Sequence, residues 1–209
     1  MKNLIIIGAR GFGREVYDLA TQCDGFNKEY TIKGFLDDKK DALDTFVNYP
    51  PILSSVESYT ISKKDVFICA LGDVRWKEKY IDLILQKGGS FINLIHPTAI
   101  INSNCILGKG LIILSRVNIS NDCHLKDFIT IQPFSAIGHD AHIGSYCHLN
   151  AYSFMGGYSV LESNVTLHTK ATILPNKKVG HGSTVGAMSL VIRNVKPNIS
   201  VFGSPAKKL

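Results

Sequence analysis

The segment from Gly138 to His148 concentrates side chains that could support catalysis or metal binding. It reads GHDAHIGSYCH and holds three of the chain's seven histidines, of which His139 directly precedes the carboxylate of Asp140. A histidine beside an acid suits a general base, because the carboxylate can fix the tautomer of the imidazole. Clustered histidines suit a metal ion if three ligands converge. The direction of each side chain decides between these chemistries, and that direction depends on the fold.

A six-residue repeat runs through the second half of the chain. Every sixth residue from Ile95 to Val191 is aliphatic or Met, and the residue four positions later is small or β-branched in most repeats, with Lys177 as the exception. Neither the period of an α-helix nor simple alternation produces this pattern. It is typical of a left-handed parallel β-helix, in which each hexad forms a short strand and a corner and three hexads form one triangular coil.

The register of the repeat gives each histidine a direction. His139 lies outside the prism near a corner, and His142 and His148 point outward from adjacent faces. His124 falls one coil before His142 on the same column, so their rings could meet at roughly 5 Å, the strand spacing. A metal there would need a third ligand from another subunit. We therefore expect no metal site and favour His139 as a general base oriented by Asp140.

The five cysteines indicate neither a disulfide framework nor a zinc site, because their number is odd and no CxxC pair occurs. Cys105, Cys123 and Cys147 fall on the small inward position of the repeat. We expect them to be buried packing residues, and Cys147 to be a poor nucleophile although it neighbours His148.

The overall composition predicts a packed globular protein. Hydrophobic residues make up 45% and charged residues 19% of the chain, and no apolar run reaches the ~20 residues of a membrane span. The net charge of +6 comes from scattered basic residues, which gives little support to nucleic-acid binding. The opening MKNLIIIGARGFG lacks the longer core of a signal peptide, so we expect a cytoplasmic protein.

Residues 1–92 do not follow the repeat and alternate strand and helix patterns instead. LIIIGARGFGREVYDLA reads as a buried strand, a glycine-rich turn and a helix, and WKEKYIDLILQKG as an amphipathic helix. IKGFLDD, DVFICALGD and SFINLI read as further strands. This predicts a small Rossmann-like parallel α/β domain over residues 1–92, followed over residues 93–209 by the left-handed β-helix of hexapeptide repeats with a C-terminal tail.

The strand ends of the first domain form a candidate nucleotide site, because ligands of parallel sheets bind at the carboxyl ends of the strands. The turn from Gly8 to Gly13 has the spacing GxxGxG, which lets an anion approach backbone N–H groups and a helix N-terminus. A nucleotide or nucleotide sugar fits this short domain better than a dinucleotide. Asp37 and Asp38 are placed to accept hydrogen bonds from ribose or base, and another strand ends at Gly72 and Asp73. The alternative is a tight turn capped by two surface acids.

The motifs together resemble one family of enzymes. Its markers are IIIGARGFGREV, GFLDD, ALGDVRWK, NLIHPTA, GHDAHIG with CHLNA, and the closing VFGSPAKKL. They resemble the sialic acid O-acetyltransferase and UDP-4-amino-sugar N-acetyltransferase family, hexapeptide-repeat acyltransferases with an N-terminal nucleotide-sugar-binding domain. The resemblance covers nearly the whole chain. It implies a homotrimer that holds acetyl-CoA as co-substrate between neighbouring prisms and the nucleotide sugar on the first domain.

The resemblance also assigns roles to single residues. His139 matches the general base, and Asp140 matches the carboxylate that raises its basicity, where some relatives carry Glu. His148, Gly157 and Ala187 match positions that contact acetyl-CoA. The nucleotide-sugar contacts correspond to Gly11 with its flanking residues and to the acids at the strand ends, giving the expected set Gly8, Ala9, Arg10, Gly11, Asp37, Asp38, Gly72 and Asp73.

The expected function is acetyl-CoA-dependent N-acetylation of a nucleotide-linked amino sugar, such as a UDP-4-amino sugar, in surface glycan or glycoprotein synthesis. The sugar amine would attack the thioester directly, with His139 as general base. Two alternatives remain: an O-acetyltransferase acting on a sugar hydroxyl such as that of sialic acid, and a non-catalytic trimeric protein that binds sugar nucleotides.

Overall fold

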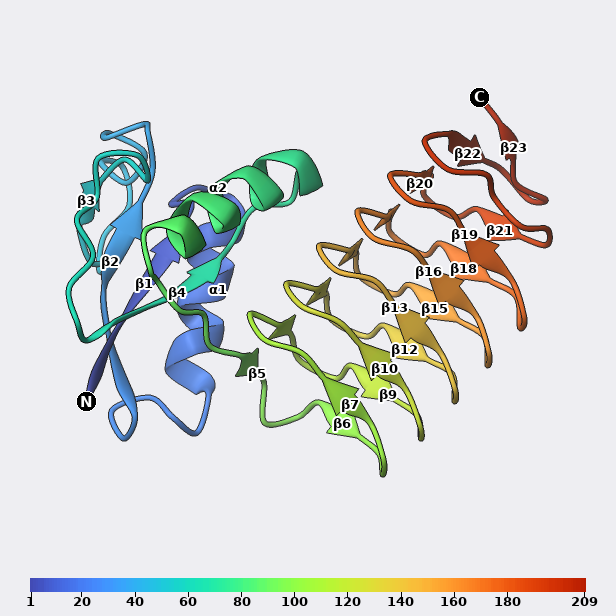
Figure 1. The fold of residues 1–209 in the computed structure, drawn as a ribbon, viewed down its shortest axis with the longest axis horizontal. Coiled ribbons are helices and arrows are strands. Elements are labelled where there is room, and N and C mark those ends of the chain that lie inside the picture. Colours follow the sequence, from blue (N-terminus) through green and yellow to red (C-terminus); the bar gives the residue numbers. More distant parts are fainter. The chain divides into compact units, whose positions relative to one another are not determined.

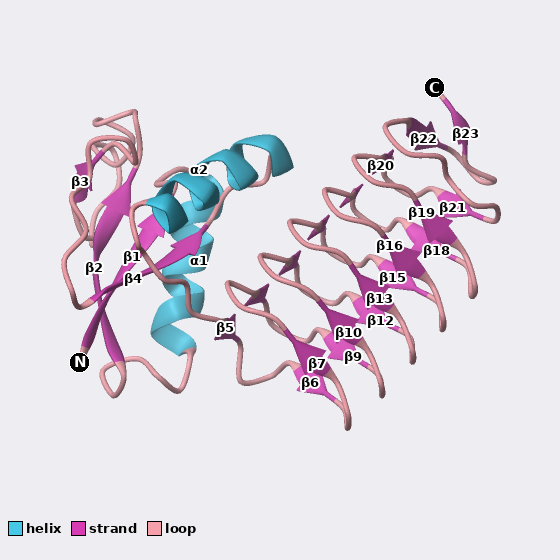
Figure 2. Ribbon diagram, viewed as in Figure 1, coloured by secondary structure: helices cyan, strands magenta, loops and turns pink.

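The computed structural model describes every residue from Met1 to Leu209 and divides into two units, residues 1–97 and 98–209. Helices occur only in the first unit, and the second is a stack of short strands and turns (Figure 2). Neither helix has the length and apolar character required to cross a membrane.

The first unit is built on a parallel four-stranded sheet in the order β3–β2–β1–β4 (Figure 1). The strands are β1 (Lys2–Ile7), β2 (Tyr30–Leu36), β3 (Ile52–Ser54) and β4 (Asp65–Cys69), and the helices are α1 (Gly11–Gln22) and α2 (Val74–Gln86). Every residue of β4 is buried, as expected for a parallel strand covered on both faces. The predicted Rossmann-like parallel domain is confirmed.

Two details of the first unit differ from the expectation. The strand β3 was not predicted from the sequence; it has three residues and follows two prolines. The segment SFINLI does not form one strand: it contributes an isolated bridge at Phe91 and the two-residue β5 (Leu94–Ile95). Both are too short to give a clear period in the sequence.

Two glycines allow α1 to start close behind β1. Gly8 has a φ of +97°, which a side chain rarely tolerates. A Cβ on Gly13 would lie 2.0 Å from the carbonyl oxygen of Gly8. The GxxGxG spacing therefore serves the close approach of the helix to the strand.

The second unit is a parallel β-helix with three faces, as predicted from the repeat. One face contains β7 (Ile106–Leu107), β10 (His124–Leu125), β13 (His142–Ile143), β16 (Val160–Leu161) and β19 (Lys178–Val179). The next contains β8 (Ile112–Ile113), β11 (Thr130–Ile131), β14 (His148–Leu149), β17 (Thr166–Leu167), β20 (Thr184–Val185), β22 (Ser200–Phe202) and β23 (Lys207–Lys208). The third contains β6 (Ile100–Ile101), β9 (Asn118–Ile119), β12 (Ala136–Ile137), β15 (Phe154–Met155), β18 (Thr172–Ile173) and β21 (Leu190–Val191).

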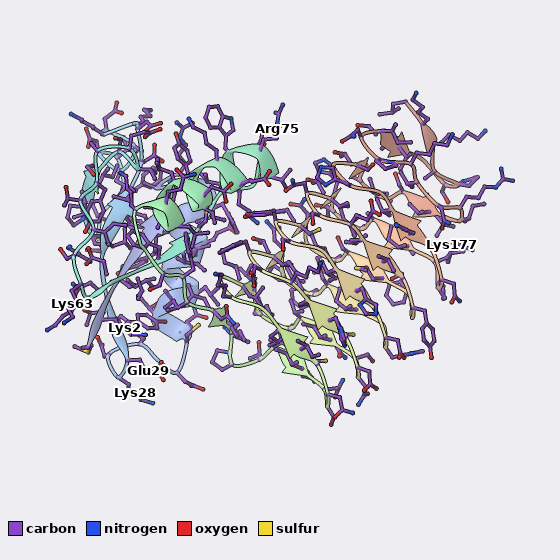
Figure 3. The ribbon with its side chains drawn as sticks, viewed as in Figure 1. Lys2, Lys28, Glu29, Lys63, Arg75 and Lys177 are labelled. Atoms are coloured by element: carbon purple, nitrogen blue, oxygen red, sulfur yellow. The ribbon has the colours of Figure 1, made fainter.

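The core of the β-helix follows the predicted register. Leu125 pairs with Ile143, a separation of 143 − 125 = 18 residues, so one coil contains three hexads. The aliphatic positions from Ile113 to Val191 are all 2% exposed or less. At the small inward position Cys123 and Cys147 are buried and Cys105 is half-buried. Lys177, the exception in the sequence, is also half-buried (labelled in Figure 3).

The corners of the β-helix repeat a left-handed backbone conformation. Every sixth residue from Asn104 to Met188 has a positive φ, including bulky residues such as Phe134 and Tyr152. Non-glycine residues adopt this conformation rarely. Their side chains project from the corners and stack between coils: the rings of Phe134 and Tyr152 are 5.0 Å apart and nearly parallel. Asp140 occupies one of these corner positions.

Candidate active site

A cavity of about 490 Å³ opens at the carboxyl ends of β1, β2 and β4 in the first unit. This volume falls in the range of small-molecule sites. Its lining includes six of the eight residues expected to bind a nucleotide sugar, namely Gly8, Arg10, Asp37, Asp38, Gly72 and Asp73. The other two lie outside the lining. Ala9 is fully buried, and Gly11 is the exposed first residue of α1.

Asp37 is held rigidly beneath the glycine-rich turn. Its Oδ2 accepts the Ala9 N–H at 2.9 Å and its Oδ1 accepts the Lys39 N–H at 2.9 Å. The side chain is 8% exposed, and Arg10 Nη2 lies 3.9 Å from Oδ1. Asp37 therefore ties the ends of β1 and β2 together and also lines the cavity. The turn-capping alternative expected a surface acid, whereas Asp37 is buried.

Asp38 is exposed and connects the end of β2 to α2. Its Oδ2 accepts the hydroxyl of Tyr80 at 2.8 Å. The phenol loses solvent and lies beside this carboxylate, and both effects raise the pKa of Tyr80 well above its ordinary value. Tyr80 therefore stays a hydrogen-bond donor, and Asp38 keeps lone pairs available for a ligand.

The two helices that border the cavity begin differently. No side chain caps the start of α1, where Arg10 is the N-cap residue. At α2 the carboxylate of Asp73 accepts the Arg75 N–H at 2.9 Å and pairs with Arg75 Nη2 at 3.0 Å. These bonds lower the pKa of Asp73. Figure 3 labels Arg75 at this end of α2. The start of α1 is thus the better place for an anion.

His139 and Asp140 form a close pair on a corner of the β-helix. Nδ1 of His139 lies 2.8 Å from Oδ2 of Asp140, and the two side chains are 57% and 38% exposed. An ionised carboxylate only accepts hydrogen bonds, so this contact places the imidazole proton on Nδ1 and leaves Nε2 as the basic nitrogen. The side chain of Asp140 is therefore long enough to reach the imidazole of His139, at the position where some relatives carry Glu.

The imidazole of His139 occupies space next to Gly157 in the following coil. A Cβ on Gly157 would lie 2.8 Å from Nε2 and 2.9 Å from Cε1 of His139. The ring of Tyr158 stands perpendicular to the imidazole with centroids 5.2 Å apart. Gly157 and Tyr158 therefore limit the orientations available to His139.

The other histidine pair is stacked as the repeat predicts. The rings of His124 and His142 have centroids 4.7 Å apart, on exposed positions of β10 and β13. No group of three or more His, Cys, Asp or Glu side chains is arranged to hold a metal ion.

The first unit matches a known protein family. Residues 3–84 fit the model described as the PglD N-terminal domain. Over 151 residues the chain is 28% identical to a GDP-perosamine N-acetyltransferase of Escherichia coli O157:H7, covering 70% of this chain and 68% of that protein. The family model covers most of the first unit, and the similarity to the acetyltransferase is longer than that unit and so extends into the second.

Other proteins match the chain over different shares of its length. The chain is 34% identical over 116 residues to a serine acetyltransferase of Buchnera aphidicola, but spans only 38% of that protein and 54% of itself. The crystal structure of PerB from Caulobacter crescentus, in complex with CoA and GDP-perosamine, superposes with a TM-score of 0.88 at 24% identity, covering 100% of this chain and 98% of PerB. That structure supports the fold of both units.

The remaining predicted site residues lie on the β-helix. His148 begins β14 and is buried, with Nε2 3.4 Å from Nε2 of Gln132 in the preceding coil. Ala187 is exposed near the C-terminal end of the unit. Gly157 lies beside the imidazole of His139. This contact was not part of the prediction, which assigned Gly157 to acetyl-CoA.

Several residues of the cavity were not predicted from the sequence. Trp76 and Tyr80 of α2 line it together with the loop residue Val56. In the sequence Trp76 and Tyr80 read only as part of an amphipathic helix, although their spacing of four residues places them on one face. Val56 follows β3, which the sequence did not reveal.

Proposed function

We propose that this chain is an acetyl-CoA-dependent N-acetyltransferase that acetylates the amine of a nucleotide-linked amino sugar. The observation that carries the proposal is the pair of His139 and Asp140, an exposed imidazole with Nδ1 held 2.8 Å from a carboxylate. The similar protein of Escherichia coli O157:H7 is named for acetylation of GDP-perosamine, and PerB was crystallised with CoA and GDP-perosamine.

The proposed reaction is direct transfer. The sugar amine attacks the carbonyl carbon of the thioester, the N–C bond forms as the C–S bond breaks, and CoA leaves as a thiolate. His139 accepts the proton lost by the amine at Nε2, because Nδ1 carries its own proton toward Asp140. The resulting imidazolium is stabilised by Asp140 and can return the proton to the thiolate.

Binding of both substrates in register supplies much of the rate, because the thioester is already activated. In this proposal the first unit binds the nucleotide, with its diphosphate near the uncapped start of α1 and Arg10, which is 72% exposed. Acetyl-CoA binds on the β-helix unit, where His148, Gly157 and Ala187 are the proposed contacts. His139 stands on an exposed corner, so we propose that a neighbouring copy in a homotrimer supplies the other wall of the acetyl-CoA site.

The test is release of free CoA by the purified full chain from acetyl-CoA and a panel of UDP-, GDP- and CMP-linked amino sugars. We expect activity with at least one amino sugar, and a loss of about 10²-fold or more in His139→Ala, the scale of losing a general base. Hydroxyl analogues in the same panel test the O-acetyltransferase alternative. Full activity of His139→Ala, or failure of the wild-type protein to bind acetyl-CoA, would contradict the proposal.

Two of the protein's five thiols are protected from a thiol-specific reagent in this assay. Burial raises the pKa of Cys69 to about 12 and that of Cys123 to about 11. The thiolate is the reactive form, so both cysteines react slowly near pH 8. A reaction without acceptor sugar measures the remaining background.

A further inference from the structure

Trp76 is the chain's only tryptophan and lines the cavity of the first unit. It lies in the first turns of α2 and is 50% exposed. A half-exposed indole beside a cavity offers a ligand a large flat surface and an N–H donor.

The ring of Trp76 is held in place by its neighbours on α2. It stacks on Tyr80 with centroids 5.9 Å apart and an interplanar angle of 26°. Tyr80 is itself 9% exposed and donates its hydroxyl to Asp38. Trp76, Tyr80 and Asp38 therefore form a connected wall that runs from the indole to the carboxylate at the end of β2.

A lysine outside the cavity lining contacts both rings of this wall. The ammonium of Lys79 lies 4.7 Å from the ring centroid of Trp76 and 5.0 Å from that of Tyr80. Lys79 is not part of the cavity lining, whereas Trp76 and Tyr80 are. Trp76 and Tyr80 both line the cavity, so an aromatic wall is offered to a flat ligand group.

We propose that Trp76 is a nucleotide-binding residue whose indole stacks on the heterocyclic base. Asp38, oriented by Tyr80, accepts a hydrogen bond from an N–H of that base or from the ribose. The chemistry fits both groups, since any base offers a π face and a carboxylate only accepts hydrogen bonds. The inference rests on the proposed nucleotide-sugar function and assigns the base to the α2 side of the cavity.

Tryptophan fluorescence of the full wild-type chain tests the position of the base. The emission reports on Trp76 alone, because no other tryptophan is present. We expect GDP and UDP to change the emission saturably and inorganic pyrophosphate, which has no base, to change it little. Nucleotide binding detected by calorimetry without a change in emission would overturn the proposal.

Calorimetry on variants tests the contribution of the stack. Trp76→Ala should weaken GDP and UDP binding about 10-fold or more, the scale of one base–aromatic stack, while Trp76→Phe keeps most of the affinity. Phe46→Ala is the matched control, because Phe46 is an aromatic residue of the same unit, 43% exposed and outside the cavity. Its affinity should equal that of the wild type.

The possible failures are distinguishable. Equal nucleotide affinities of Trp76→Ala and wild type would overturn the stacking proposal and leave the proposed function standing. An equal loss of affinity in Phe46→Ala would also overturn it. If the wild-type chain binds no nucleotide at all, the nucleotide part of the proposed function fails as well.

Discussion

The imidazole of His139 lies where a side chain on Gly157 would have to be. An added Cβ would come within 2.8 Å of Nε2, closer than real Cβ atoms approach other heavy atoms. The two residues are 157 − 139 = 18 apart, which is one coil of the β-helix. The absence of a side chain at Gly157 thus leaves the space that the imidazole of His139 occupies.

Gly157→Ala should lower kcat by about 10²-fold, because the new methyl group displaces the imidazole from its position over the backbone. Steady-state kinetics check this, with the unfolding temperature measured to confirm that the β-helix is intact. A variant with unchanged kcat and a raised KM for acetyl-CoA would instead assign Gly157 to the cofactor alone.

A double variant separates the two roles of Gly157. If the glycine acts through His139, then Gly157→Ala added to His139→Ala should cause little further loss. Additive losses in the double variant would show that Gly157 acts independently of the imidazole.

Asp140→Asn should lower kcat by about 10- to 100-fold, less than the loss in His139→Ala. The amide can donate to Nδ1, which favours the tautomer that carries its proton on Nε2 and removes the base. Asp140→Glu is the matched control and should keep much of the activity, since it retains a carboxylate. The measurement is the initial rate of CoA release. Equal rates for Asp140→Asn and wild type would exclude an orienting role.

Lys87→Met should destabilise the loop that contains Val56. The ammonium of Lys87 donates to the carbonyl oxygens of Val56 at 2.9 Å, of Glu57, and of Tyr59 at 3.2 Å. Loss of these charged hydrogen bonds should cost about 1–3 kcal/mol in urea unfolding. Because Val56 lines the cavity, the KM for the nucleotide sugar should also rise.

Lys63→Met is the control for this prediction, because Lys63 is an exposed lysine of the same unit (Figure 3). Its unfolding midpoint should match that of the wild type. If both lysine variants lose the same stability, the effect comes from charge in general and not from the three carbonyl groups.

Protonation of Asp65 at low pH should lower the free energy of unfolding of the protein. Burial alone would raise the pKa of this carboxyl, but hydrogen bonds from the Ser62 N–H, the Tyr59 hydroxyl, Asn3 and Lys33 outweigh it, so the pKa lies below its ordinary value. A lowered pKa stabilises the folded state above the unfolded pKa of about 4, and this stabilisation is lost as the pH falls through the folded pKa. Thermal unfolding between about pH 2 and pH 6 should therefore show a steeper acid loss in wild type than in Asp65→Asn. Parallel curves would contradict the assignment.

The sequence predicted the β-helix well because each of its periods has one inward aliphatic position. Ile137 and Ile143 could be placed in the core by counting, and the directions of His139 and His142 followed from them. The same count relates His139 to Gly157, but the contact between them was not predicted, since the repeat fixes columns and not the rotamer of an exposed ring.

The first unit was harder to predict in detail. Its strand ends were identified from runs such as IKGFLDD, and six of the eight expected residues line one cavity. Trp76 was missed because a residue on an amphipathic helix gives no sign of which neighbour it faces. The turn residue Asp37 was predicted as a ligand contact, yet both of its oxygens already accept backbone N–H groups, which only the folded turn reveals.

The equivalence of residues one coil apart also limits which changes in length the second unit can accept. A six-residue insertion would keep the aliphatic positions pointing inward, yet it would rotate everything that follows by one face, a third of a turn. After such an insertion between them, His139 would no longer meet Gly157, although the core would still be filled. An insertion of a full coil elsewhere would lengthen the prism and leave the pair intact. Natural variation in the length of this unit should therefore fall outside residues 140–156 wherever the contact between His139 and Gly157 is retained.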